Sequence, residues 1–361
     1  MSQTTGNPSP PNQASLELDA LVDQLVAYHG EEVSPASPAD AGVRAVRRLA
    51  EAKMDAIRHR LEGDEDLQRL AHLGRWLEQD IERISPVFEA RHARLVPSWA
   101  LDHPNSRLHH QGRLLLSNAI GRDLEAPHVD DPLDPACDLA SLLVGLESRH
   151  EEGLAHQVLD RYLSLSGDYE ITRLLSLFRV CHALSGARRS LERRSLAGKD
   201  LEHPALLAEI MAECRRFLAL AEVHADFRFP PLVISVGVSG SGKSRFTRGL
   251  VEGLGAVRLC SDVERRRLVD TDADGRADLF YDEATHHTYQ RLASLAGILL
   301  DAGLVACVDG TFLRRWQRDL LRQQAEARGL PCLLVSFEAD HATLKGRIET
   351  LAGLIRDHVG V

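Results

Sequence analysis

The chain has 361 residues, 44% of them hydrophobic and 27% charged, and at roughly 100–200 residues per domain this length predicts two globular domains. The formal net charge of −10 argues against broad binding of nucleic acid or of an anionic membrane, since both need a positive surface. The sequence contains no ~18-residue apolar run and no CxxC pair among its six cysteines, so we expect a cytoplasmic protein with free thiols and no zinc site.

The N-terminal part has a helical pattern. Residues 1–15 are polar, and we expect them to form a disordered tail. Between 16 and 228 apolar residues recur mostly at helical spacing, with a Pro/Ser spacer at 33–38 and an irregular stretch at 97–135. Pro86 is expected to weaken the helix that contains it. We therefore predict a mostly α-helical domain over residues 16–228.

The character of the chain changes at Phe229. Short apolar runs rich in β-branched residues now alternate with helical segments, and they cover Leu232–Val236, Val257–Cys260, Leu304–Val308 and Cys332–Phe337. Such alternation is typical of a parallel sheet with helices on both faces. We therefore predict an α/β domain over residues 229–361.

A glycine-rich motif follows the first of these strands and opens a helix. It fits G-x-x-x-x-G-K-[ST] with Gly237, Val238, Ser239, Gly240, Ser241, Gly242, Lys243 and Ser244. The glycines let backbone N–H groups point at phosphate oxygens, and Lys243 adds a positive charge. The Ser244 hydroxyl can join the shell of a Mg²⁺ ion. This motif predicts that the domain binds ATP with Mg²⁺.

Two carboxylates stand at the ends of later strands, which face the ligand crevice in a parallel sheet. Asp262 is placed to accept a proton from a substrate hydroxyl, and Arg265 to hold an anionic substrate or a phosphate. The alternative is that Asp262 is the N-cap of a solvated, Arg-rich helix. Asp309 is placed to hold Mg²⁺ through water, and its alternative is also a cap. Four arginines at 314, 315, 318 and 322 are expected to be mostly solvated, with room for one to reach the crevice.

The C-terminal part resembles P-loop small-molecule kinases with an AAA-type domain, a group that includes gluconate kinases, zeta toxins and polynucleotide kinases. The resemblance is carried by 237–244, by Ser261–Arg266, by the run Tyr281…Thr285…Tyr289 and by Val308–Phe312. It implies a five-stranded nucleoside-kinase-like sheet, a general base at Asp262 and a substrate or phosphate contact at Arg265.

The domain before it resembles the C-lobe of aminoglycoside phosphotransferases in Asp134–Ala140, Leu159–Tyr162 and Gly167-Asp168, so that the whole resemblance covers about 95–361. The family's catalytic loop HGDLHxxN falls on 99–106. There Trp99, Ala100 and Leu101 replace the catalytic His, Gly and Asp, and further on Asn118 replaces the metal-binding Asp. We therefore expect a degenerate domain without phosphotransferase activity.

The kinase-like part also departs from its family. Its lid should carry two arginines four residues apart; Arg347 matches the first, and the second position is Leu351. The sequence ends at Val361, about where the lid should turn into a last strand, so we expect that strand to be missing.

Three functions follow as hypotheses. The first is an ATP- and Mg²⁺-dependent kinase for a small hydroxyl compound, with Asp262, Lys243, Arg265 and Arg347 in the reaction and Ser244 and Asp309 at the metal. The second is a nucleotide-binding regulatory or scaffold protein without turnover. The third, a polynucleotide or toxin-like kinase, is disfavoured by the negative charge.

Overall fold

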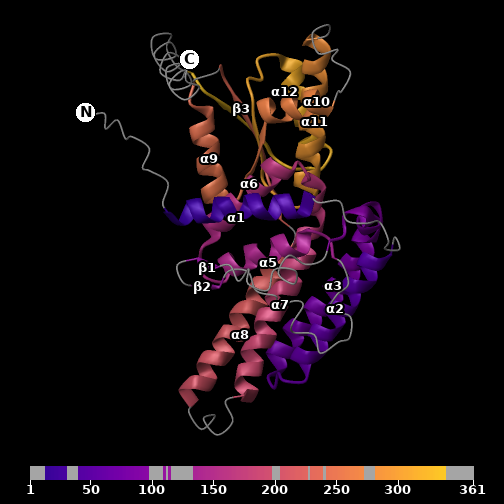
Figure 1. Cartoon of the computed structure of the whole chain (residues 1–361), viewed down its shortest axis with the longest axis vertical. Helices are drawn as coiled ribbons and strands as arrows, with labels where there is room; N and C mark the ends of the chain where they lie inside the picture. The colour runs from indigo at the N-terminus through magenta and orange to yellow at the C-terminus, as the bar shows by residue number, and fades with distance from the viewer. Residues whose placement is uncertain are drawn as a thin grey trace, which may run out of the picture. The chain divides into compact units, whose positions relative to one another are not determined.

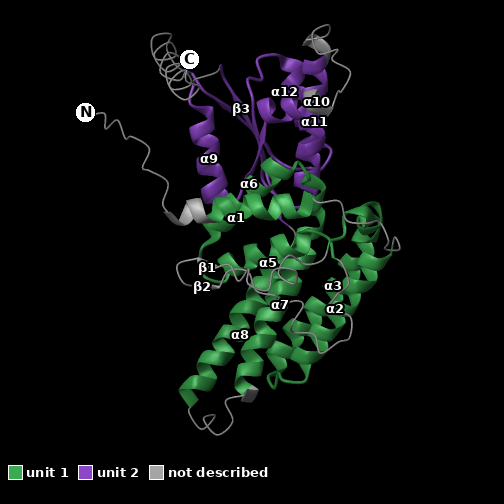
Figure 2. Ribbon diagram, in the orientation of Figure 1, with its two compact units in different colours: residues 1–227 green, residues 228–361 purple. Residues whose placement is uncertain are grey.

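The computed structural model describes residues 13–30, 40–96, 109–110, 113–114, 133–196, 204–226, 228–238, 241–271 and 281–338. It divides into two compact units, residues 1–227 and 228–361 (Figure 2). The domain boundary expected at about residue 229 is close to this division between residues 227 and 228.

The first unit is mostly helical, as predicted. Its helices are α1 (Gln13–Gly30), α2 (Ala41–Arg58), α3 (Asp64–Ala90), α5 (Ala136–Glu147), α6 (Glu152–Ser166), α7 (Thr172–Leu196) and α8 (Pro204–Ala225). Two 3₁₀ turns (His92–Arg94 and Tyr169–Ile171) and the antiparallel pair β1 (His109–His110) and β2 (Arg113–Leu114) lie between them. Because α1 begins at Gln13, the end of the expected disordered tail is helical.

Helix α3 contains Pro86 and continues past it to Ala90. Proline removes one backbone hydrogen bond in a helix interior. The side chains of Ile84 and Phe88 on either side are each 1% exposed, and burying two large apolar groups outweighs that lost bond.

Helix α7 is the centre of the first unit and packs against α2, α3, α5 and α8 (Figure 1). Its buried side chains lie on all sides of its axis and include Leu174, Leu175, Leu177, Val180 and Ala183. Burial on all sides is typical of a helix surrounded by other helices. The fold of the unit therefore depends on α7 more than on any amphipathic surface helix.

A buried charge network joins three connections of the first unit. The Arg91 guanidinium donates to Asp134 from Nε at 2.7 Å and to Asp168 from Nη1 at 2.7 Å. Arg91 follows α3, Asp134 precedes α5, and Asp168 follows α6. Asp168 is reached through Gly167, whose φ of 68° ends α6 in the left-handed conformation. This network ties these three helix ends together.

The second unit is an α/β domain. Its elements in chain order are β3 (Leu232–Val236), α9 (Lys243–Leu254), β4 (Val257–Cys260), α10 (Ser261–Thr271), α11 (Tyr281–Asp301), β5 (Ala306–Asp309), α12 (Arg315–Glu326) and β6 (Cys332–Ser336). The four strands are parallel in the order β4-β5-β3-β6. Helix α9 covers one face of the sheet, and α11 and α12 cover the other (Figure 1). This confirms the predicted parallel sheet with helices on both faces.

Strand β5 begins later than the sequence predicted. Gly303, with φ of 73°, ends the turn after α11, and the N–H of Leu304 donates to the carbonyl of Leu299. Leu304 therefore closes the helix, and ladder pairing starts at Ala306 and includes Asp309. The expected absence of a fifth strand concerns residues 339–361, which lie outside the described part of the chain. No helix in the described ranges is long and apolar enough to cross a bilayer.

Candidate functional site

The sheet register brings three strand ends together at one edge. Strand β5 lies between β3 and β4, and Asp309 at its end pairs with Ser235 on one side and with Cys260 on the other. Gly237 follows Ser235 by two residues, and Asp262 follows Cys260 by two. Because parallel strands end at the same edge, the glycine-rich loop and both carboxylates start from adjacent points.

Two glycines give the loop its path. Gly237 has φ of 151°, and a Cβ there would lie 2.7 Å from the carbonyl oxygen of Phe337. Gly242, with φ of 103°, is the last residue before α9. Both conformations are strained for residues with a side chain, so the loop needs glycine at these two positions. The N–H of Gly237 donates to the carbonyl of Thr311 at 3.2 Å and holds the loop against the segment after β5.

Lys243 bends back over this loop. Its Nζ donates to the carbonyls of Gly237 and Val238, each at 2.8 Å, and its side chain is buried. Burial lowers the pKa of Lys243, and the negative charges of Asp309 and Asp262 oppose that shift. The ammonium is therefore held at the strand ends by acceptors of its own loop and by two carboxylates.

Ser244 and Asp309 form an oxygen-rich pair beside the lysine. The Ser244 hydroxyl donates to Oδ2 of Asp309 at 3.3 Å. The Ser235 hydroxyl donates to the Val308 carbonyl at 3.1 Å and lies 3.4 Å from Oδ1 of Asp309. Asp309 is 7% exposed. A hydroxyl and a carboxylate are the hard oxygen donors that Mg²⁺ prefers. Ser244 and Asp309 therefore fit the Mg²⁺ ion that accompanies a nucleotide. Asp309 is the last residue of β5, so it is not a helix cap.

The loop also fits the phosphates of a nucleotide. The Ser241 hydroxyl is buried and makes no hydrogen bond to any described residue. A buried hydroxyl without a partner costs about 1–3 kcal/mol, and a phosphate oxygen would satisfy it. The cramped space at Gly237, the cation of Lys243 and this hydroxyl are together the features of an anion-binding loop.

Asp262 and Arg265 lie on the first turns of α10. Asp262 is exposed and sits in the first turn, where the helix dipole favours a carboxylate. Its charge acts on Lys243, so it lies within electrostatic reach of the loop. Arg265 is partly buried one turn further along. Ser239, Gly240 and Arg347, also predicted as site residues, lie outside the described part of the chain.

Two residues that support the site were not predicted. Glu264 is fully buried, accepts from Arg291 Nε at 2.7 Å and also pairs with Arg267, which ties α10 to α11. A Cβ on Gly310 would meet the Phe312 ring at 2.9 Å, so this glycine lets the chain turn closely after Asp309. Gly310 could have been recognised as a glycine directly after a strand, whereas the role of Glu264 depends on tertiary contacts. Of the four arginines considered after Asp309, Arg318 donates to the carbonyl of Phe312 at 2.6 Å.

These features define a P-loop nucleotide-binding domain of the NTPase-like α/β class. Among known families, the model of an AAA domain matches residues 232–352, which contain the loop, Asp262 and Asp309. The match places this AAA domain in the second unit.

Similar curated proteins are known from mycobacteria. The uncharacterized proteins Rv2004c of Mycobacterium tuberculosis and Mb2027c of Mycobacterium bovis are each 30% identical to this chain over 186 residues. The match covers 50% of this chain and 36% of each relative, so the chain spans about a third of their length. Their names assign no activity.

Proposed function

We propose that this protein is an ATP- and Mg²⁺-dependent kinase that transfers a phosphoryl group to a hydroxyl of a small molecule. The observation that carries the proposal is the meeting of Lys243, Ser244 and Asp309 at adjacent parallel strand ends, with the charge of Asp262 acting on the lysine. A base beside a phosphate-binding loop is the arrangement that phosphoryl transfer to a hydroxyl requires.

Each residue has a distinct role in this proposal. Lys243 and the amides of the loop 237–244 bind the phosphates, while Ser244 and Asp309 hold Mg²⁺, which supplies neutralisation of phosphate charge when bound. Asp262 accepts the proton of the acceptor hydroxyl, since it is exposed and therefore open to a substrate. Arg265 and Arg347 contact negative charge on the substrate or the phosphates.

The nucleotide site is tested by a thermal-shift titration of the full chain with ATP–Mg²⁺ beside Lys243→Ala. We expect a concentration-dependent rise in Tm for the wild type and little or none for the variant. Asp319→Asn is a matched surface control on α12, where Asp319 pairs only with Arg315 and Arg322 among the described residues. Full ATP affinity in Lys243→Ala would refute the assignment of the loop.

Turnover is tested by ADP release with sugars, nucleosides and small alcohols as acceptors. Removing a general base costs about 10²–10⁴-fold in rate, so Asp262→Asn should bind ATP normally and lose that much acceptor-dependent activity. If Asp262→Asn turned over at the wild-type rate, the role of the base would be wrong.

A nucleotide-binding regulatory protein is the second candidate. The observation that favours it is Leu351, which stands where the kinase family has a second lid arginine. An arginine clamp can contribute 10³–10⁵ in rate, so its loss would slow transfer far more than binding. This candidate predicts an ATP-dependent Tm shift with no acceptor-dependent ADP release. We further propose that the first unit transfers no phosphoryl group, because Trp99, Leu101 and Asn118 stand where the phosphotransferases that it resembles have catalytic residues.

A further inference from the structure

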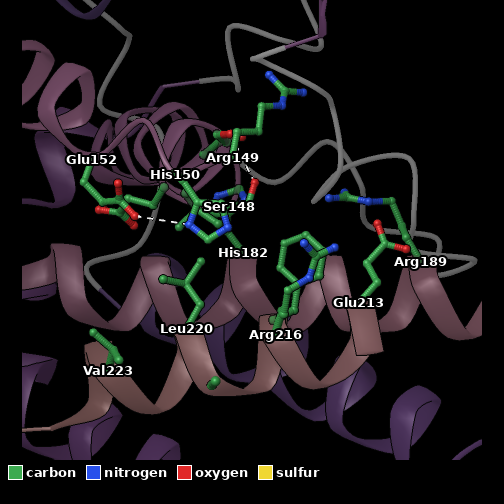
Figure 3. Close-up of a pocket in the computed structure, with 16 residues that line it drawn as sticks. Ser148, Arg149, His150, Glu152, His182, Arg189, Glu213, Arg216, Leu220 and Val223 are labelled. Atoms are coloured by element: carbon green, nitrogen blue, oxygen red, sulfur yellow. Dashed lines mark hydrogen bonds and ion pairs between the residues drawn. The ribbon is translucent and has the colours of Figure 1, made fainter. Parts of the chain in front are cut away.

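The first unit contains a cavity of about 480 Å³ that the nucleotide site does not use. It is enclosed by the end of α5, the α5–α6 turn, α7 and α8 (Figure 3). Four residues of α8 that share one helix face form its longest wall, at Arg216, Phe217, Leu220 and Val223. A volume of 300–1,000 Å³ is usual for a small-molecule site.

His182 on α7 is the polar group in this wall that is least accessible to water, since it is only 5% exposed. Its Nε2 lies 2.9 Å from the carbonyl oxygen of Cys137, so Nε2 carries a proton and donates. Burial and the positive charge of Lys53 hold the pKa of His182 well below its usual range, which keeps the ring neutral. In the neutral ring Nδ1 is then an acceptor.

That acceptor has no hydrogen bond to any residue in the described ranges. Because His182 lines the cavity, a molecule bound there can supply the donor. The atom that would satisfy Nδ1 is a donor, such as a hydroxyl.

Two of the three carboxylates that line the cavity are paired with arginines. Glu147 lies 3.7 Å from Arg179 and also accepts from His224 Nε2 at 2.8 Å. Glu213 accepts from Arg193 at 2.5 Å. The third, Glu152, has a 53% exposed side chain, so water screens its charge.

Arg216 adds positive charge at the cavity wall. It is exposed, and among the described residues it makes no hydrogen bond or ion pair. Arg149 and Arg189 also line the cavity. A guanidinium in this setting suits a carboxylate, which it can bind with two parallel hydrogen bonds.

The remaining wall is apolar and shaped by a glycine. A Cβ on Gly186 would lie 2.4 Å from the ring of Phe217, so only glycine lets this ring pack directly against α7. Together with Leu220 and Val144 the ring forms a surface for an apolar body. The cavity thus combines one histidine acceptor, one exposed cation and an apolar wall.

We propose that this cavity is a binding site for a small organic acid with an apolar body and a hydroxyl group, whose acid faces Arg216 and whose hydroxyl donates to His182 Nδ1. The site lies within the first unit and does not depend on the proposed kinase activity.

The test is calorimetric titration of the full chain, without nucleotide, with three matched probes. 4-Hydroxyphenylacetate carries the acid, the ring and the hydroxyl; phenylacetate lacks the hydroxyl; p-cresol lacks the acid. We expect the first probe to bind about tenfold or more tightly than either of the others. Equal binding of all three, or no heat at millimolar concentrations of any, would overturn the proposal.

Variants then locate the site. Arg216→Ala removes an exposed side chain and should weaken 4-hydroxyphenylacetate about tenfold or more, whereas Arg47→Ala, at an exposed arginine on α2, should change nothing. His182→Phe keeps a ring in the wall and should abolish the preference over phenylacetate. Binding that Arg216→Ala leaves unchanged would refute the site even if His182→Phe failed to fold. Lys243→Ala should retain the binding, which separates this result from any result at the nucleotide loop.

Discussion

Asp309→Asn separates metal-dependent from metal-independent nucleotide binding. The Asp309 side chain is 7% exposed, accepts from the Ser244 hydroxyl at 3.3 Å and lies 3.4 Å from the Ser235 hydroxyl. Asparagine has the same shape and can still accept one hydroxyl and donate to the other. We therefore expect the variant to fold, at a cost of no more than about 1 kcal/mol.

The magnitude follows from ligand linkage. ATP–Mg²⁺ at about 100 times its Kd stabilises the folded state by about 2.7 kcal/mol. If the lost carboxylate weakens binding about tenfold, the same ligand concentration stabilises by about 1.4 kcal/mol. At about 4 °C per kcal/mol for a domain of this size, the Tm gain would fall from about 11 °C to about 6 °C.

The assay is thermal unfolding of the second unit with ATP in excess Mg²⁺ and in excess EDTA. In EDTA the variant should bind ATP at least as well as the wild type, because a carboxylate without its metal repels phosphate. Asp319→Asn, on the surface of α12, should match the wild type in both conditions. An equal loss of affinity for Asp309→Asn with and without Mg²⁺ would refute the metal role.

Three other changes test the structure. Gly237→Ala should abolish the ATP-dependent Tm rise, because its Cβ would lie 2.7 Å from a backbone oxygen, while Gly253→Ala, with nothing within 4 Å, should preserve it. Glu264→Gln should lower the free energy of unfolding of the second unit by about 1–3 kcal/mol in denaturant titrations, since the buried Glu264 carboxylate accepts from the partly exposed Arg291 and Arg267 and a neutral amide replaces these ion pairs. Burial alone would raise the pKa of Asp168, but the hydrogen bonds and charge of Arg91 outweigh it and lower the pKa. The ion pair between Asp168 and Arg91 should therefore stabilise the first unit above about pH 4 and lose that effect at lower pH. In Asp168→Asn the free energy of unfolding should depend less on pH in the acid range. The same acid dependence as in the wild type would contradict this prediction.

The local sequence signals predicted the second unit well. Strands β3 and β4 have the bounds that their apolar runs indicated, because both are short, β-branched and followed by a glycine or a charged helix start. The run at Leu304 was misread, since an apolar residue can close a helix as easily as begin a strand. Periodicity cannot distinguish these two uses over such a short segment.

The supporting residues of the site could not be found from the sequence. Glu264 stands beside Arg265 and Arg266, which made its segment look like a solvated helix. Its burial follows from the packing of α10 on α11, which brings Arg291 to it from 27 positions away. The same holds for the cavity at His182, whose wall joins helices that no local pattern brings together.

The two units differ in what their motif residues do for the fold. Asp134 and Asp168, which carry part of the phosphotransferase resemblance, are both held by Arg91, so their presence is explained by the joining of three helix ends. In the second unit, Lys243 contacts carbonyls of its own loop and Ser241 keeps a buried hydroxyl without a described partner. Those contacts stabilise little of the domain and leave polar groups that a ligand would satisfy. Motif residues with a structural task are weak evidence for activity, whereas motif residues that cost stability are strong evidence for a ligand.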